Sequence, residues 1–247
     1  MPTLIYEGRI EPEAYALTVD YKPKLKRQET EHSPVVEFEV VVFVGRVRVY
    51  ATADDIDERM AEYLIFAAWD VSRIFVETVG FIKGIPYSVS LDRVVFPEGK
   101  IKSFVFADRS LAEKHDFSIN DLEALSDISL LSLPDGLLFS DILMTLGKAH
   151  YSPIACGRVA DSLARLIAPE EKRVQQWEML RETLRVDEAF VRSLTDVSKA
   201  LRHGDRVPVD ASTNQETAHR AWALLGRYLR YRLNGKLDPE AYPILTG

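Results

Sequence analysis

The sequence of 247 residues contains little cysteine and no long apolar segment. Cys156 is the only cysteine, which excludes an internal disulfide and fits a reducing compartment. Apolar runs such as residues 64–69 are far shorter than the ~18 residues that a membrane span needs. The first residues lack the basic and then apolar pattern of a signal peptide. We therefore expect a cytoplasmic protein that does not engage a membrane.

Several motifs that carry chemistry are also missing. The sequence has no Walker loop, no GxSxG elbow, no HExxH pair and no multi-cysteine pattern, so we expect neither a metal nor a cofactor. A nucleophilic pair of Cys156 and His150 is conceivable, although a buried thiol usually serves packing. The net charge of −7 means that nucleic acid would need a local basic patch.

Alternating apolar and polar residues mark an antiparallel hairpin over residues 35–52, with its turn at Val44–Gly45. Charged residues alternate with the apolar ones. The hairpin also carries two exposed aromatic residues, Phe43 and Tyr50, and these two would either pack across the strands or bind a flat ligand. The expected core face of the hairpin consists of Phe38, Val40, Val42, Val47, Val49 and Ala51.

A second hairpin is predicted for residues 87–96 and 100–106, and a long helix for residues 55–79. Asp55, with Glu58 three residues later, would cap that helix. Residues 1–108 are thus expected to form an α+β domain in which antiparallel hairpins pack on one long helix.

After residue 110 the pattern is helical only, which predicts an all-α bundle over residues 118–247 after a linker at 109–117. A break is expected at Pro134–Asp135–Gly136, and Thr213 with Glu216 would form a capping box for the last helix. The three tryptophans occupy helical positions typical of a core. The expected helices cover residues 118–125, 136–149, 152–168, 170–185, 188–203 and 214–233.

The helix expected at 188–203 has two distinct faces. Its apolar face holds Phe190, Leu194, Val197 and Leu201. The opposite face carries a polar stripe of Arg192, Asp196, Lys199 and His203, with Arg202 beside it. Such residues either work chemically or simply complement the negative end of the helix dipole before Gly204.

The end of the chain is basic although the whole is acidic. Residues 192–236 hold nine basic and four acidic side chains. One interpretation is a phosphate-binding surface of Arg206, Arg220, Arg227 and Arg230. The other is a solvated face whose arginines pair with acids of neighbouring helices. Arg232 falls within an apolar arc, where an ion pair with Asp161 or Glu178 is expected.

The helices "RVADSLARLI" (158–167) and "FVRSLTDVSKALRHGD" (190–205), followed by a long closing helix, resemble the HEPN superfamily of small helical bundles. Catalytic members carry an arginine shortly before the histidine, where this sequence has Ser198, Val197 and Asp196. The resemblance implies a homodimerising module that binds a nucleotide, RNA or a partner protein. The alternative is a metal-independent endoribonuclease that uses His203 with Arg202, Arg192, Lys199 and Asp196.

Overall fold

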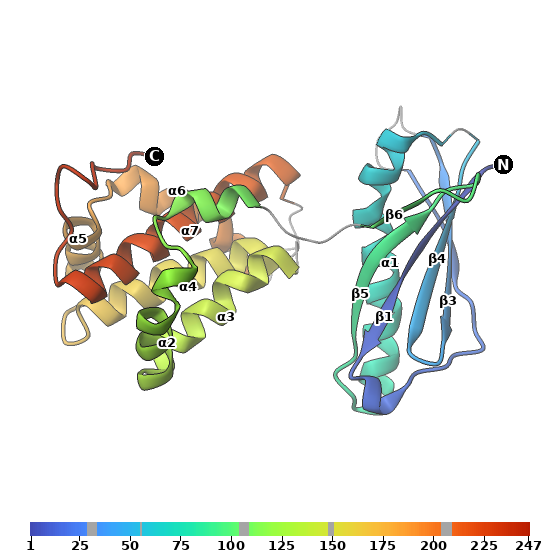
Figure 1. Cartoon of the computed structure of the whole chain (residues 1–247), viewed down its shortest axis with the longest axis horizontal. Helices are drawn as coiled ribbons and strands as arrows, with labels where there is room; N and C mark the ends of the chain where they lie inside the picture. The colour runs from blue at the N-terminus through green and yellow to red at the C-terminus, as the bar shows by residue number, and fades with distance from the viewer. Residues whose placement is uncertain (29–33, 55, 104–108, 148–150, 204–208) are drawn as a thin grey trace. The chain divides into compact units, whose positions relative to one another are not determined.

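The computed structural model describes residues 1–28, 34–54, 56–103, 109–147, 151–203 and 209–247. The chain divides into two compact units, Met1–Val105 and Phe106–Gly247. The first consists of an antiparallel sheet with one long helix, and the second of helices (Figure 1). The predicted α+β layout, with an all-α bundle after it, is confirmed.

The first unit is built on a six-stranded antiparallel sheet with strand order β2-β3-β4-β1-β5-β6. One face of this sheet packs against α1, and its inward side chains alternate with outward ones because successive residues of a strand point to opposite faces. The strands are β1 (Thr3–Glu11), β2 (Lys24–Arg27), β3 (Val36–Phe43), β4 (Arg46–Thr52), β5 (Ser88–Val95) and β6 (Ile101–Ser103).

Strands β3 and β4 form the hairpin that the alternation predicts. Val44 and Gly45 at the turn both have positive φ, which suits the two-residue turns that match strand twist. Every residue of the expected core face is at most 1% exposed. The second predicted hairpin is present as β5 and β6, and the remainder of its second strand, 104–106, lies outside the described residues.

Helix α1 (Glu58–Lys83) is shifted towards the C-terminus relative to the prediction. Its N-cap is Asp57, whose side chain accepts a hydrogen bond from the Met60 backbone N–H, whereas Asp55 lies outside the described residues. The helix continues past Gly80 and ends at Gly84, which adopts the left-handed conformation. The 85–87 segment returns close to Gly80: the Ile85 N–H bonds to the Gly80 carbonyl, and a Cβ at position 80 would lie 2.6 Å from the Ile85 carbonyl oxygen.

The second unit surrounds α4, which packs against α3, α5, α6 and α7. Residues 109–117, expected to form a linker, begin instead with a short 3-10 helix, η2 (Arg109–Lys114), whose Leu111 is buried in the core of this unit. The helices are α2 (Leu122–Leu131), α3 (Leu133–Gly147), α4 (Ser152–Ile167), α5 (Arg173–Leu184), α6 (Glu188–Arg202) and α7 (Ala211–Asn234).

Several helix boundaries correct the sequence-based prediction: the helix expected at 118–125 is α2, which runs to Leu131. The expected break at Pro134–Asp135–Gly136 is wrong, because these residues form the first turn of α3, where proline is tolerated since that N–H needs no helical partner. Helix α7 starts at Ala211, and its cap is Asp210, not Thr213. Asp210 accepts hydrogen bonds from both the backbone N–H and the hydroxyl of Thr213.

Among the described residues, no single helix is both long and apolar enough to cross a membrane. One strongly bent pair, Ile119–Leu131 with Leu133–Leu146, passes the same test of length and composition.

Candidate functional site

Helix α6 has the two faces that the sequence predicts. Asp187 caps it by accepting a hydrogen bond from the Phe190 N–H, and Phe190 and Leu194 are buried, whereas the expected core residues Val197 and Leu201 are only partly buried. The opposite stripe of Arg192, Asp196, Lys199 and His203 is exposed to solvent. His203 is the C-cap residue, and its ring makes no hydrogen bond or ion pair with any residue that the structure describes. The stripe therefore exists as a surface, without a local network around the imidazole.

Two arginines of this helix are engaged in ion pairs. Arg192 pairs with Glu188 one turn earlier, with 2.5 Å between nitrogen and oxygen, instead of with Asp196. Arg202 pairs with Asp161 of α4, and the other oxygen of Asp161 lies 2.7 Å from Arg173 at the start of α5. Asp161 thus joins three helices, and Arg202 has a structural role that the sequence analysis did not anticipate.

Helices α4 and α6 approach each other closely at Gly157. A Cβ atom built there would lie 2.1 Å from the Ser198 hydroxyl oxygen, which is far inside van der Waals contact. Ser198 is fully buried and donates its hydroxyl hydrogen to the Thr195 carbonyl. Small residues at this crossing hold α6 against the core and keep its polar stripe outward.

The arginines of α7 are bound within the fold. Arg227 is 7% exposed and donates to the carbonyls of Leu184, Arg185 and Pro243. Burial lowers the pKa of Arg227, and the nearby Arg185 lowers it further. These contacts tie the C-terminal segment to the α5–α6 connection, so the buried Arg227 serves the fold instead of an exposed phosphate surface.

Arg230 and Arg220 are engaged in a similar way. The Arg230 guanidinium donates to the carboxylate and to the carbonyl of Asp116, and it lies 4.0 Å from the centre of the Phe117 ring. Arg220 pairs with Glu216, 2.5 Å away, one turn earlier on the same helix. Arg206, the remaining residue of the predicted phosphate surface, lies outside the described residues.

Arg232 makes an ion pair, but with neither of the two expected partners. Its guanidinium lies 2.6 Å from a carboxylate oxygen of Asp135, whose side chain is 0% exposed. The hydroxyl of Tyr228 donates to the other carboxylate oxygen of Asp135 at 2.7 Å. The expected partners were wrong because the first turn of α3, predicted as a break, brings Asp135 beneath α7.

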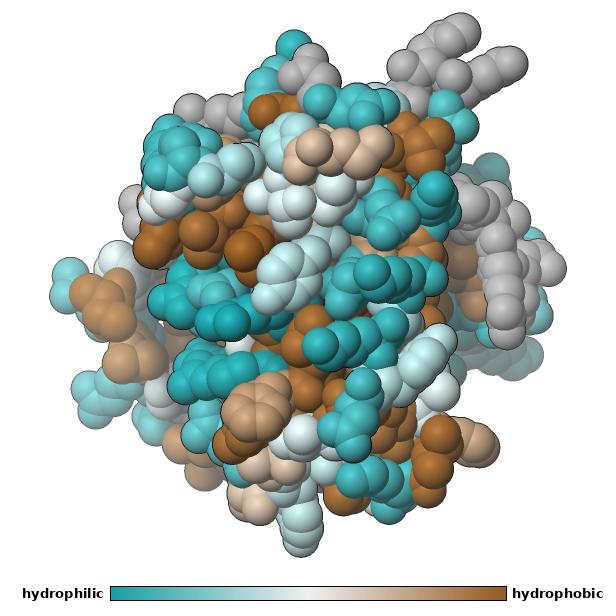
Figure 2. Space-filling model, turned by 90° about the vertical axis from the view of Figure 1, so that its right-hand side faces the viewer, coloured by the Kyte–Doolittle hydropathy of each residue, from teal (hydrophilic) through white to brown (hydrophobic). Residues whose placement is uncertain are grey.

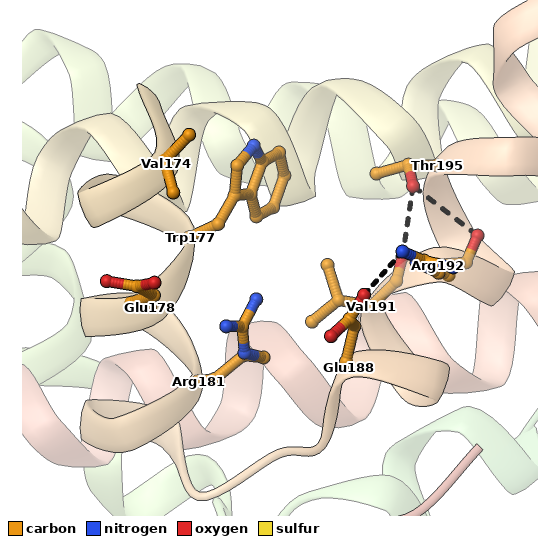
Figure 3. Close-up of a pocket in the computed structure, with 8 residues that line it drawn as sticks. All are labelled: Val174, Trp177, Glu178, Arg181, Glu188, Val191, Arg192 and Thr195. Atoms are coloured by element: carbon orange, nitrogen blue, oxygen red, sulfur yellow. Dashed lines mark hydrogen bonds and ion pairs between the residues drawn. The ribbon is translucent and has the colours of Figure 1, made fainter. Parts of the chain in front are cut away.

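The described part of the helical unit contains a groove between α5 and α6, with a volume of about 370 Å³. Helix α5 contributes Val174, Trp177, Glu178 and Arg181, which share one face at helical spacing. The facing side of α6 contributes Glu188, Val191, Arg192 and Thr195. Figure 3 shows the Trp177 ring and the Arg181 side chain extending from α5 towards the space between the helices.

Polar and apolar groups are combined in this groove. The Arg181 and Glu178 side chains make no hydrogen bond or ion pair with residues that the structure describes. Trp177 packs partly against the core, with Arg173 over its ring at 5.7 Å, and the rest of its surface lines the groove. The helical position of Trp177 predicts a core residue, and no sequence motif singles out Arg181. The spacing of 174, 177, 178 and 181 was the available signal.

The other proposed chemistry receives little support. Burial raises the pKa of Cys156 to about 12, so its thiol stays protonated, and His150 lies outside the described residues. Among the described residues, no group of three or more His, Cys, Asp or Glu side chains is arranged to hold a metal ion.

Two family models match the chain. Residues 4–105 match the N-terminal domain of DUF8168, and residues 122–233 match its C-terminal domain, both described as domains of unknown function. The matched ranges agree with the two structural units. Neither a curated protein nor a solved structure matches the chain.

Proposed function

We propose that the helical unit is a binding module that holds a nucleotide in the α5–α6 groove. The chain that carries it consists of a DUF8168 N-terminal and a DUF8168 C-terminal domain. The observation that carries this proposal is the joint presence of an aromatic ring, Trp177, and the uncommitted guanidinium of Arg181 along one groove of ligand size.

The chemistry of the groove matches the parts of a nucleotide. A base stacks on the exposed part of Trp177, as bases do on aromatic side chains. Arg181 and Arg192 supply guanidinium groups to the phosphate, since arginine matches phosphate geometry with paired donors. The carboxylate of Glu178 accepts hydrogen bonds from sugar hydroxyls. Glu188 already neutralises part of the Arg192 charge, so Arg181 is the principal phosphate ligand.

The test is calorimetric titration of the whole protein with AMP. Arg181→Ala should weaken AMP binding about tenfold, because a charge-assisted hydrogen bond is lost. Trp177→Leu keeps the core contact but removes the stacking surface, and a similar loss is expected. Arg165→Ala is the matched control, because Arg165 is exposed on α4 and does not line the groove. The proposal fails if AMP gives no binding, or if Arg181→Ala and Arg165→Ala behave alike.

Endoribonuclease activity is the alternative function. It is favoured only by the common exposed face of Arg192, Asp196, Lys199 and His203, since Arg202 is paired with Asp161. Incubation with RNA in EDTA, beside a His203→Ala variant, tests it. Cleavage that depends on His203 would establish a nuclease and replace the simple binding role.

We further propose that the helical unit forms a homodimer, as its resemblance to the HEPN superfamily implies. Large apolar side chains of α2 and α3 are exposed, among them Leu130 at 83% and Leu131 at 87%. Exposed apolar clusters of this kind often mark protein interfaces. Light scattering should give a dimeric mass that Leu130→Glu with Leu131→Glu reduces to a monomeric one. A monomeric parent protein would refute this part.

The single cysteine supports a cytoplasmic setting for the protein.

A further inference from the structure

The outer face of the sheet, opposite α1, carries four arginines on three neighbouring strands. Arg46 of β4 is paired with Arg9 of β1. In the next outward-facing row of the sheet, Arg48 of β4 and Arg93 of β5 lie on either side of Glu7 of β1. Figure 2, which views the side at the right of Figure 1, shows a mainly hydrophilic surface with apolar side chains scattered on it. We call Arg9, Arg46, Arg48 and Arg93 the arginine band.

The pairing of Arg9 with Arg46 is unfavourable for the fold. Like charges directly opposite each other on neighbouring strands destabilise a sheet. Arg9 is partly compensated by Glu11, at 3.8 Å, whereas the Arg46 side chain makes no hydrogen bond or ion pair with any residue that the structure describes. An anion bound between these two guanidiniums would relieve the repulsion.

Glu7 holds the other two arginines in place. One of its carboxylate oxygens accepts from Arg48 Nε and the other from Arg93 Nε, each at 2.7 Å. The Glu7 side chain is 15% exposed, against 57% and 51% for the two arginines. Because the bonds use the inner Nε atoms, the terminal amino groups of Arg93 stay available on the surface, while Arg48 also shares a hydrogen bond with the Tyr50 hydroxyl.

A β-bulge supports this arrangement. The register between β1 and β5 shifts between Glu7 and Gly8, and Asp92 is the extra residue that results. Asp92 and Arg93 are therefore both exposed, although neighbouring residues of a regular strand face opposite sides. Bulges commonly redirect a side chain next to a binding site. Without this one, Arg93 would not stand opposite Glu7.

The band borders a hollow of about 410 Å³ whose lining includes Arg46, Arg48, Arg93, Glu7 and Asp92. Both Glu7 oxygens are already occupied by arginines, so the donors that face the hollow outnumber its free carboxylates. Phe43 of β3, which is 66% exposed, is paired directly with Arg46 of the neighbouring strand β4. On the other side of the band runs an apolar row across four strands, formed by Tyr50, Ile5, Val95 and Ile101.

We infer that the arginine band binds the phosphates of a single-stranded nucleic acid, whose unpaired bases stack on Phe43. Guanidiniums next to exposed aromatic rings are the combination by which proteins hold such strands without reading sequence. An acidic peptide would use the guanidiniums but would offer no flat base to Phe43. This inference concerns the sheet unit and does not rest on the nucleotide groove of the helical unit.

The test measures fluorescence anisotropy of a short labelled single-stranded oligonucleotide, titrated with the whole protein over a range of salt concentrations. Arg46→Ala should weaken binding about fivefold and lower the slope of log affinity against log salt by about one, because one phosphate contact is lost. Arg59→Ala is the matched control, since Arg59 is exposed on α1 and makes no ion pair with described residues. Arg46 has no partner to lose, so the variant should fold normally.

A second variant and two competitors decide the ligand class. Phe43→Ala should weaken oligonucleotide binding about tenfold but leave competition by polyphosphate unchanged, because only bases stack. The duplex form of the same oligonucleotide should bind more weakly than the single strand. Equal effects of Arg46→Ala and Arg59→Ala would overturn the inference. So would a Phe43→Ala variant that binds as the parent does. Repeating the titration in the Arg181→Ala background separates this surface from the groove.

Discussion

The two units use their arginines differently. In the helical unit Arg227, Arg230 and Arg232 are bound by carbonyls and carboxylates from distant parts of the chain. In the sheet unit Arg46 has no such partner, and Arg48 and Arg93 keep their terminal groups at the surface. The arginines of α7 in the basic stretch are therefore committed to the fold, whereas the arginine band of the sheet unit keeps donors at the surface. The contrast predicts that removing an arginine bound within the helical unit costs more stability than removing one from the sheet surface.

Arg227→Ala should produce the largest loss of stability. It leaves the carbonyls of Leu184, Arg185 and Pro243 without their donor, and we expect the free energy of unfolding of the helical unit to fall by about 3 kcal/mol. Urea unfolding followed by hydrogen exchange reports on the two units separately. Arg46→Ala is the counterpart and should change stability by less than about 0.5 kcal/mol. Equal effects of the two variants would abolish the comparison.

Asp135→Asn tests the buried end of the Arg232 pair. The fully buried carboxylate accepts from both Arg232 and Tyr228, and we expect a loss of about 2 kcal/mol, reduced because Arg232 itself is partly exposed. The same urea unfolding measurement applies, with Asp196→Asn on the exposed face of α6 as control. A loss no greater than that of the control would show that the pair is dispensable.

Asp161→Asn should have a smaller effect that depends on salt. Its pairs with Arg202 and Arg173 are partly exposed, so we expect a loss of about 1 kcal/mol that shrinks as ionic strength rises. Glu170→Gln, at an exposed position just after α4, is the control. A loss that persists unchanged in high salt would point to packing instead of charge.

The pH dependence of the helical unit should show the smallest effect. Burial lowers the pKa of His115, which stacks on Trp222 with ring centres 6.2 Å apart. The unfolded chain then binds a proton more readily than the fold, so stability is complete above the ordinary histidine pKa of about 6.5 and declines as pH falls through it. Stability curves of the parent and of His115→Gln should diverge in shape there. Parallel curves would refute the assignment.

A second decline belongs to Asp116. Burial alone would raise its pKa, but hydrogen bonds from Arg230 and Tyr242 outweigh burial and lower it. The stabilisation by Asp116 is therefore present above the ordinary aspartate pKa of about 3.9 and is lost as pH falls below it. Tyr242→Phe removes one of these bonds and should make the low-pH decline shallower in the same unfolding experiment.

The features predicted correctly from the sequence depend on neighbours along the chain. Phe38 and Val40 follow a period of two, and Phe190 and Leu194 a period near 3.6, so each pattern identifies its own buried face. The outward stripe ending at His203 follows from the same geometry. Caps were missed by a few residues, as with Asp210 for Thr213, because several polar residues near a helix start compete for the role.

The candidate sites could not be found in this way. The groove requires the Trp177 face of α5 to lie against the Arg192 face of α6, and no periodicity states which helix faces meet. The band requires Arg48 and Arg93 on either side of Glu7, in strands far apart in sequence and brought into register by a bulge at Asp92. The resemblance to the HEPN superfamily stays a prediction.

The sequence alone determined where this chain changes from strands to helices, which face of each element is apolar and which arginines it has to place. Only the tertiary structure decided which of those arginines have partners. Local periodicity reflects the backbone geometry of single elements, whereas the partners of Arg227 and Arg232 come from segments that meet only when the bundle closes.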